Sequence, residues 1–81
     1  MDTLKGYPII ATFPTQARGC DRGGRIIILD RGETHEERYV VAWQGATCVT
    51  VWASHWEQSV YCRDLATARL MFVARVEKEV L

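Results

Sequence analysis

The sequence predicts a small α+β domain: a four- to five-stranded antiparallel meander sheet with one C-terminal helix packed on one face. Three observations support this fold class. Short stretches rich in β-branched and aromatic residues follow one another through the first two-thirds of the chain. Residues 65–80 contain no Pro or Gly and carry apolar residues at helical spacing. Successive strands followed by a helix are typical of a sheet with a helical layer.

The strands are expected between turn-forming segments. They are residues 7–13, 25–30, 38–44 and 48–55, with a short fifth strand at 58–62. Pro8 near the start of the first strand suits an edge position, and Pro14 is expected to end that strand. Residues 14–24 then form a loop rich in Gly and polar residues, and residues 45–47 form a hairpin turn.

The C-terminal helix is the clearest element of the sequence. Asp64 is a suitable N-cap, and the helix is expected from Leu65 to about Val80. The residues expected on its buried face fall within one arc of the helix: Leu65, Phe72, Val73, Val76 and Val80. Leu70 and Met71 lie outside this arc, so we expect them to be partly exposed.

Both faces of the predicted sheet are apolar. In residues 25–30, for example, Ile26 and Ile28 alternate with Ile27 and Leu29. A single helix covers only one face, so the second face has three possible fates, and the sequence leaves all three open. The sheet can curl over it, two copies can stack on it, or a partner can bind there.

Length and charge limit the classes of function. The chain of 81 residues forms one domain, residues 1–81, and buries only roughly 60–65% of its unfolded surface. Ten basic residues balance ten acidic ones, so no overall field attracts nucleic acid or an anionic membrane. Cys20, Cys48 and Cys62 are odd in number and widely spaced, which is typical of reduced thiols in the cytoplasm. No signal-peptide core and no membrane-spanning apolar run is present in the sequence.

No pattern of catalytic or metal-binding residues stands out. There is no Cys-x-x-Cys, and His55-Trp56-Glu57 lacks the Pro-Cys-x-x-Cys that a zinc deaminase requires. The sequence therefore predicts a protein that is not an enzyme and that needs no cofactor or metal.

The residues best suited to bind a partner are arginines and tryptophans, which are the usual anchors of protein interfaces. We predict contacts by Arg18, Arg22, Arg25, Trp52 and Trp56. The alternatives are a plain hairpin loop at residues 18–25 and a core role for the aromatic residues.

The whole chain resembles the small orphan proteins of phages and other mobile elements in its length and layout. It places YPIIATF, RIIILD, RYVVAWQ and CVTVWASH before the helix DLATARLMFVARV. One group of that type is the anti-CRISPR proteins. The resemblance implies a viral inhibitor that binds a host nuclease or defence complex, either a protein or a ribonucleoprotein, in the host cytoplasm and blocks its activity or nucleic-acid binding. It assigns no site residues.

Two other functions are open on the sequence alone. The loop at residues 18–25 and the aromatic residues of the sheet could bind single-stranded nucleic acid, although the neutral charge makes this less favoured. The second sheet face could form a homodimer, making the protein a structural subunit.

Overall fold

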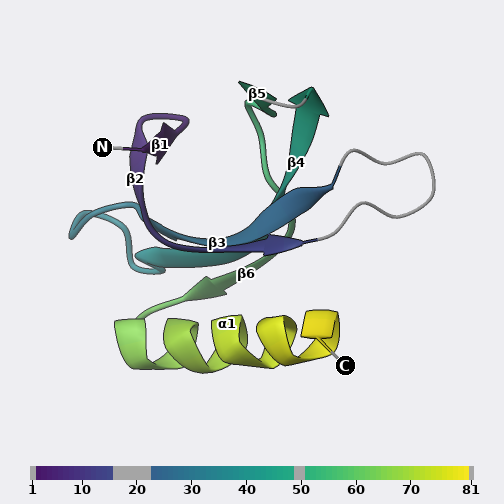
Figure 1. Cartoon of the computed structure of the whole chain (residues 1–81). Helices are drawn as coiled ribbons and strands as arrows, with labels where there is room; N and C mark the ends of the chain where they lie inside the picture. Colours follow the sequence, from purple (N-terminus) through teal and green to yellow (C-terminus); the bar gives the residue numbers. More distant parts are fainter. Residues whose placement is uncertain (1, 16–22, 49–50, 81) are drawn as a thin grey trace.

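The computed structural model describes residues 2–15, 23–48 and 51–80, and it confirms the predicted fold class (Figure 1). Six antiparallel strands form one curled sheet, and a single C-terminal helix packs against it. The elements are β1 (Thr3–Leu4), β2 (Tyr7–Thr15), β3 (Gly24–Asp30), β4 (Tyr39–Cys48), β5 (Val51–Trp52), β6 (Glu57–Cys62) and α1 (Leu65–Val80).

The sheet is a meander whose fourth strand pairs with three others. The order is β1-β2-β3-β4-β5, and β6 pairs with β4 as well. β6 uses the first half of β4, where Val41 lies opposite Val60, and β5 uses the last part, where Ala46 lies opposite Trp52. β4 therefore holds both later strands of the described chain on one of its edges and β3 on the other.

The helix buries one face of the sheet. Ala68 is fully buried there, and Phe72 and Val76 pack against the same cluster, whose buried sheet members are Ile26, Ile28, Val41 and Cys62. Asp64 caps the helix as expected, because its Oδ1 accepts a 2.7 Å hydrogen bond from the N–H of Thr67.

The contact face of α1 is rotated from the predicted arc. Val73, expected at the sheet, is 50% exposed, while Ala68 is buried in its place. The rotation brings a small residue closest to the sheet and so allows close approach. Leu70 and Met71 are 72% and 42% exposed, as predicted.

The sheet curls, and the part of its second face around Ile27 and Val40 is covered by the chain itself. Leu4 lies in a buried cluster with Ile27, Leu29, Val40 and Ala42, and Tyr7, Ile9 and Trp56 pack around it. The β1–β2 hairpin supplies this cover. Its turn residues, Lys5 and Gly6, have φ angles of 54° and 82°, the left-handed geometry that matches strand twist in tight hairpins.

Two predicted strand ends are wrong. β2 continues through Pro14 to Thr15, and Pro14 lies opposite Arg25. No other described strand pairs with this part of β2, so Pro14 lies on an edge of the sheet, the position in which Pro is tolerated. The predicted fourth strand, 48–55, does not match the structure either: Cys48 ends β4, Val51–Trp52 form β5, residues 53–55 lie in no strand, and residues 49–50 lie outside the described residues.

The predicted turn at residues 45–47 is also wrong, because β4 runs through it. Gly45 lies opposite Gly24 on β3, and the indole of Trp43 packs over both. A Cβ on Gly24 would collide with Cζ2 of Trp43, so the glycine is required by this close approach. Nε1 of Trp43 donates a 3.2 Å hydrogen bond to Oγ1 of Thr15.

In the described residues no helix has both the length and the apolar character needed to cross a bilayer.

Candidate functional site: a cavity on the concave face

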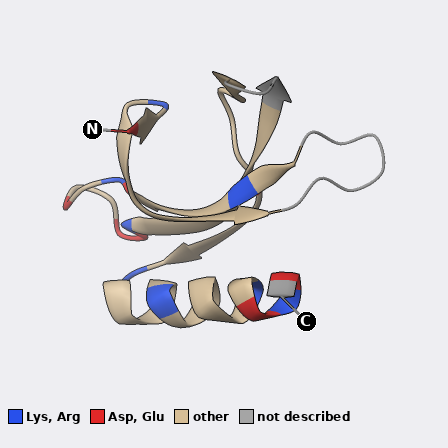
Figure 2. Ribbon diagram, in the orientation of Figure 1, with Lys and Arg blue, Asp and Glu red and all other residues tan. Residues whose placement is uncertain are grey.

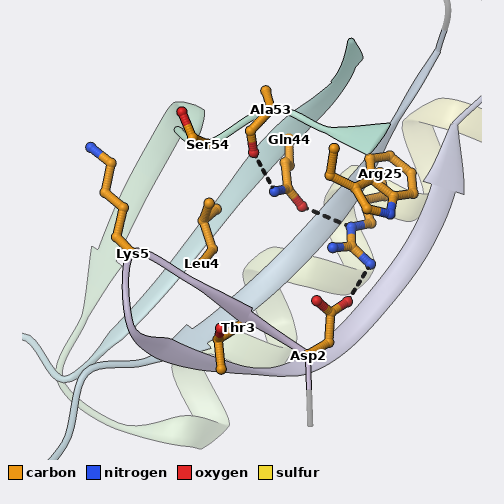
Figure 3. Close-up of a pocket in the computed structure, with 9 residues that line it drawn as sticks. Asp2, Thr3, Leu4, Lys5, Arg25, Gln44, Ala53 and Ser54 are labelled. Carbon is orange, nitrogen blue, oxygen red and sulfur yellow. Dashed lines mark hydrogen bonds and ion pairs between the residues drawn. The ribbon is translucent and has the colours of Figure 1, made fainter. Parts of the chain in front are cut away.

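The concave side of the curled sheet contains an open cavity of about 470 Å³ (Figure 3). It lies between the β1 segment on one side and the β5 segment on the other, which stand apart above the sheet (Figure 1). Ligand pockets commonly have volumes of roughly 300–1,000 Å³. Its lining residues are Asp2, Thr3, Leu4, Lys5, Arg25, Gln44, Trp52, Ala53 and Ser54.

Arg25 is the central charged residue of the cavity. It lies directly opposite Gln44 in the pairing of β3 with β4, and the side chain of Arg25 is only 10% exposed. Its Nε donates a 2.8 Å hydrogen bond to Oε1 of Gln44. Nε2 of Gln44 in turn donates to the carbonyl of Ala53 at 2.7 Å, so both side chains are fixed.

Asp2 provides the countercharge. Its Oδ2 lies 2.8 Å from Nη1 of Arg25, and its side chain is 53% exposed. The Asp2 backbone is fixed separately, because its carbonyl accepts a 2.9 Å hydrogen bond from the N–H of Ile9. The remaining terminal nitrogen of Arg25 points into the cavity, and no hydrogen bond joins it to the other residues drawn (Figure 3).

Trp52 forms the wall beside Arg25. The guanidinium carbon lies 4.1 Å from the centroid of the indole, within the range of a cation–π interaction. Trp52 is nevertheless 40% exposed. The cavity therefore combines a fixed, buried cation with a large aromatic surface that water reaches.

The structure brings together two of the five predicted contact residues. Arg25 and Trp52 meet in the cavity, although Arg25 is buried in β3 rather than exposed in a loop. Trp56 packs on the core cluster around Leu4, and Nζ of Lys5 lies 5.0 Å from its ring centroid. The remaining predicted contacts, Arg18 and Arg22, lie outside the described residues.

Sequence reasoning missed the polar partners of Arg25. Gln44 is 2% exposed and Asp2 comes from the segment just before β1. Neither belongs to a local motif, and only the register of β3 with β4 could have identified Gln44.

The other charged groups of the described chain are dispersed over the surface (Figure 2). Arg38 pairs with Asp30 at 2.7 Å, and Arg63 pairs with Glu36 at 2.8 Å. The hydrogen bond from Arg38 lowers the pKa of the Asp30 carboxyl, and the Gly32 N–H acts in the same direction. These pairs place opposite charges side by side and do not form a continuous basic surface.

The one cysteine whose side chain is described, Cys62, lies in the helix-side core. Burial raises the pKa of its thiol, and the carboxylates of Asp64 and Glu37 add to the effect. Within residues 2–15, 23–48 and 51–80 there is no group of three or more His, Cys, Asp or Glu side chains that could hold a metal ion.

Compared with known proteins, the chain matches no protein family model, and no curated protein or solved structure shows significant similarity to it.

Proposed function

We propose that this protein is a non-enzymatic interaction protein that binds a partner protein through the cavity on its concave face. The observation that carries the proposal is the contact of the fixed guanidinium of Arg25 with the exposed indole of Trp52 in that open cavity. Arg and Trp are the residues that most often dominate protein interfaces, and holding Arg25 in advance lowers the entropy lost on binding.

The class of partner follows from the resemblance to small mobile-element proteins. We propose a host nuclease or defence complex as the partner, with inhibition of its nucleic-acid binding as the outcome and the cytoplasm as the place of action. A neutral chain is a poor mimic of DNA, so direct docking through the cavity fits this protein better.

Direct nucleic-acid binding receives less support from the described residues. The guanidinium of Arg25 is neutralised by Asp2, and those of Arg38 and Arg63 are paired with acids. Phosphate contacts require basic groups free to replace counterions along a strand. The apolar part of the sheet face on which a second copy could have stacked, around Leu29 and Val40, is already covered by the β1–β2 hairpin and Trp56.

The test is inhibition of CRISPR effector complexes by the purified protein, measured as loss of target-DNA binding across a panel of effector types. Trp52→Ala should weaken binding to the inhibited complex by roughly thirtyfold or more, because a true anchor contributes about 2 kcal/mol. Leu70→Ala is the matched control, since Leu70 is an exposed apolar residue on the helix, across the sheet from the cavity.

Two results would contradict the proposal. If no effector complex is bound or inhibited, the partner class is wrong. If a complex is bound equally well by the wild type and by Trp52→Ala, the cavity is not the binding site.

A further inference from the structure

The bond between Arg25 and Asp2 indicates what the cavity can bind. We infer that it takes an acidic side chain of the partner protein, whose carboxylate replaces that of Asp2 on Arg25. This inference rests on the proposed function and specifies the chemistry of the bound segment. Asp2 is, in this view, a stand-in for that ligand, held by the chain in the unbound state.

The contact made by Asp2 leaves room for a better ligand. Its carboxylate bonds to Nη1 of Arg25 through a single oxygen, Oδ2. The second terminal nitrogen points into the cavity, and no hydrogen bond joins it to the other lining residues drawn (Figure 3). A carboxylate arriving from the cavity can bind both terminal nitrogens at once, which is the stronger, two-bond geometry that arginine forms with carboxylates.

Asp2 can leave without unfolding the segment that carries it. Its side chain is 53% exposed, so the released carboxylate passes directly into water. The backbone stays anchored, since the Asp2 carbonyl is bonded to the N–H of Ile9 and the nearby Leu4 is only 4% exposed. The exchange therefore replaces one charged hydrogen bond with another and leaves the fold intact.

The charges around the cavity favour a single negative charge. Arg25 and Lys5 are the cations of its lining and Asp2 is its anion. A monoanionic carboxylate replaces that of Asp2 on Arg25 one for one, whereas the ammonium of Lys5 points away from Arg25 (Figure 3) and lies over the ring of Trp56. A phosphate dianion would bring a second negative charge next to the displaced Asp2, which remains at the rim of the cavity.

The cavity also has surface for the residues that flank the acid. Trp52, 40% exposed, offers an aromatic surface, and Thr3 and Ser54 offer hydroxyl groups. The cavity is open to solvent, so an acid carried on a peptide segment can reach its lining. An acidic side chain within a peptide segment uses all of these contacts, whereas a small free acid uses only Arg25.

The test is a titration of the full-length, isotope-labelled protein with the short peptide Ac-Gly-Gly-Glu-Gly-Gly-NH₂, followed by NMR. The reporters are the Nε–H signal of Arg25 and the indole N–H signal of Trp52. Both should shift, with a dissociation constant in roughly the millimolar range for so small a probe. The same peptide with Gln in place of Glu, which has the same shape and no charge, should leave both signals in place.

Removal of the stand-in should tighten binding. Asp2→Asn eliminates the competing carboxylate, so the Glu peptide should bind about tenfold more tightly to this variant. Glu33→Gln is the matched control: it removes one negative charge from an exposed turn away from the cavity, and it should leave the affinity unchanged. The amide spectrum of each variant shows that it is folded, and the comparison of Glu and Gln peptides on the wild type needs no variant.

Several outcomes would overturn the inference. Equal binding of the Glu and Gln peptides, or no tightening in Asp2→Asn, would show that the acid does not replace Asp2. Tighter binding of inorganic phosphate at the same signals would assign the cavity to a different anion. An Ac-Gly₅ peptide with a free C-terminus that binds more tightly than the Glu peptide would assign it to a chain end.

These results are separable from those that test the proposed function. If the Glu peptide fails to bind while inhibition of an effector complex still depends on Trp52, the acidic ligand is wrong and the cavity remains the interface. If the peptide binds and no effector complex is inhibited, the ligand chemistry stands and the partner class is wrong.

Discussion

Arg25 is an unusual residue for the interior of so small a domain. Its residue exposure is 8%, and burial of an unpaired guanidinium would cost several kcal/mol. The charge is tolerated because Gln44, Asp2 and the indole of Trp52 all contact it. Three separate parts of the chain therefore contact one side chain. Arg25 connects these segments and is also the fixed charged group of the proposed site.

Asp30 provides a prediction about acid stability. The hydrogen bond from Arg38 holds the folded-state pKa of Asp30 below its ordinary value of 3.8. A lowered folded pKa means that the ionised carboxylate stabilises the fold above about pH 4 and that this contribution is lost as the pH falls further. Asp30→Asn should lower the melting temperature at pH 7 and flatten its decline below pH 4. Thermal melts from pH 7 to pH 2 measure this. If the melting temperature of the variant fell below pH 4 as steeply as that of the wild type, the prediction would be wrong.

Gly24 provides a prediction about packing. Because a Cβ there would collide with the ring of Trp43, Gly24→Ala should destabilise the protein by about 1–3 kcal/mol in urea unfolding. Gly32→Ala would be a poor control, since its φ of 90° adds backbone strain. The sharper comparison is Gly24→Ala in a Trp43→Leu background, where the added methyl should cost less but should still cost something, because it would also lie 2.6 Å from the carbonyl oxygen of Gln44. Equal costs in the two backgrounds would exclude the indole as the cause.

At the level of elements, α1 has one face that stabilises the fold and one that does not. Phe72 packs on the sheet, whereas Leu70 is 72% exposed. Phe72→Ala should therefore cost about 2–3 kcal/mol of unfolding free energy, and Leu70→Gln should change it by less than about 0.5 kcal/mol. Urea denaturation followed by far-ultraviolet circular dichroism measures both. A large loss in Leu70→Gln would mean that the outer face of α1 is covered in solution.

The elements also show where sequence patterns are informative. The helix and the strands β3 and β6 were predicted within about two residues, because capping and apolar runs mark them directly. The sequence predicts a strand end at Pro14 and a turn at Gly45, because both residue types have a high local propensity for turns. Tertiary context overrides both: Pro14 lies where β2 has no outer partner, and Gly45 lies beneath the ring of Trp43. β1 and β5 have two residues each and leave no periodic signal.

At the level of the whole molecule, β1 closes the core of the curled sheet. Leu4 is 4% exposed and joins a cluster whose other buried members belong to β3 and β4. Leu4→Ala should cost about 2–5 kcal/mol of stability in urea unfolding. It should also weaken the Arg25–Asp2 contact, because Leu4 positions the segment that carries Asp2. A loss of stability without any shift of the Arg25 Nε–H signal would show that Leu4 stabilises the core but does not position Asp2.

The candidate site could be predicted only in part. Arg25 and Trp52 were chosen because Arg and Trp are common in interfaces, and the structure places them in contact. Trp56 is a predicted contact residue for the same reason, but its ring packs on the core around Leu4. Asp2 and Gln44 could not be found from sequence. Their contacts with Arg25 depend on the tertiary arrangement that brings the segment before β1 and the strand β4 to the same side chain of β3.

The two sides of the cavity differ in how firmly the sheet holds them. β3 is hydrogen-bonded along both edges and buried from Gly24 to Leu29, whereas β1 and β5 are held by pairs of two residues each. Amide hydrogens of β3 should therefore exchange with solvent near the rate of global unfolding, and those of β5, whose two residues are both exposed, by local fraying. The cavity thus has a base that keeps its shape and one side, β1, tied to the core by Leu4, so the β5 side is the one that can shift as a partner enters.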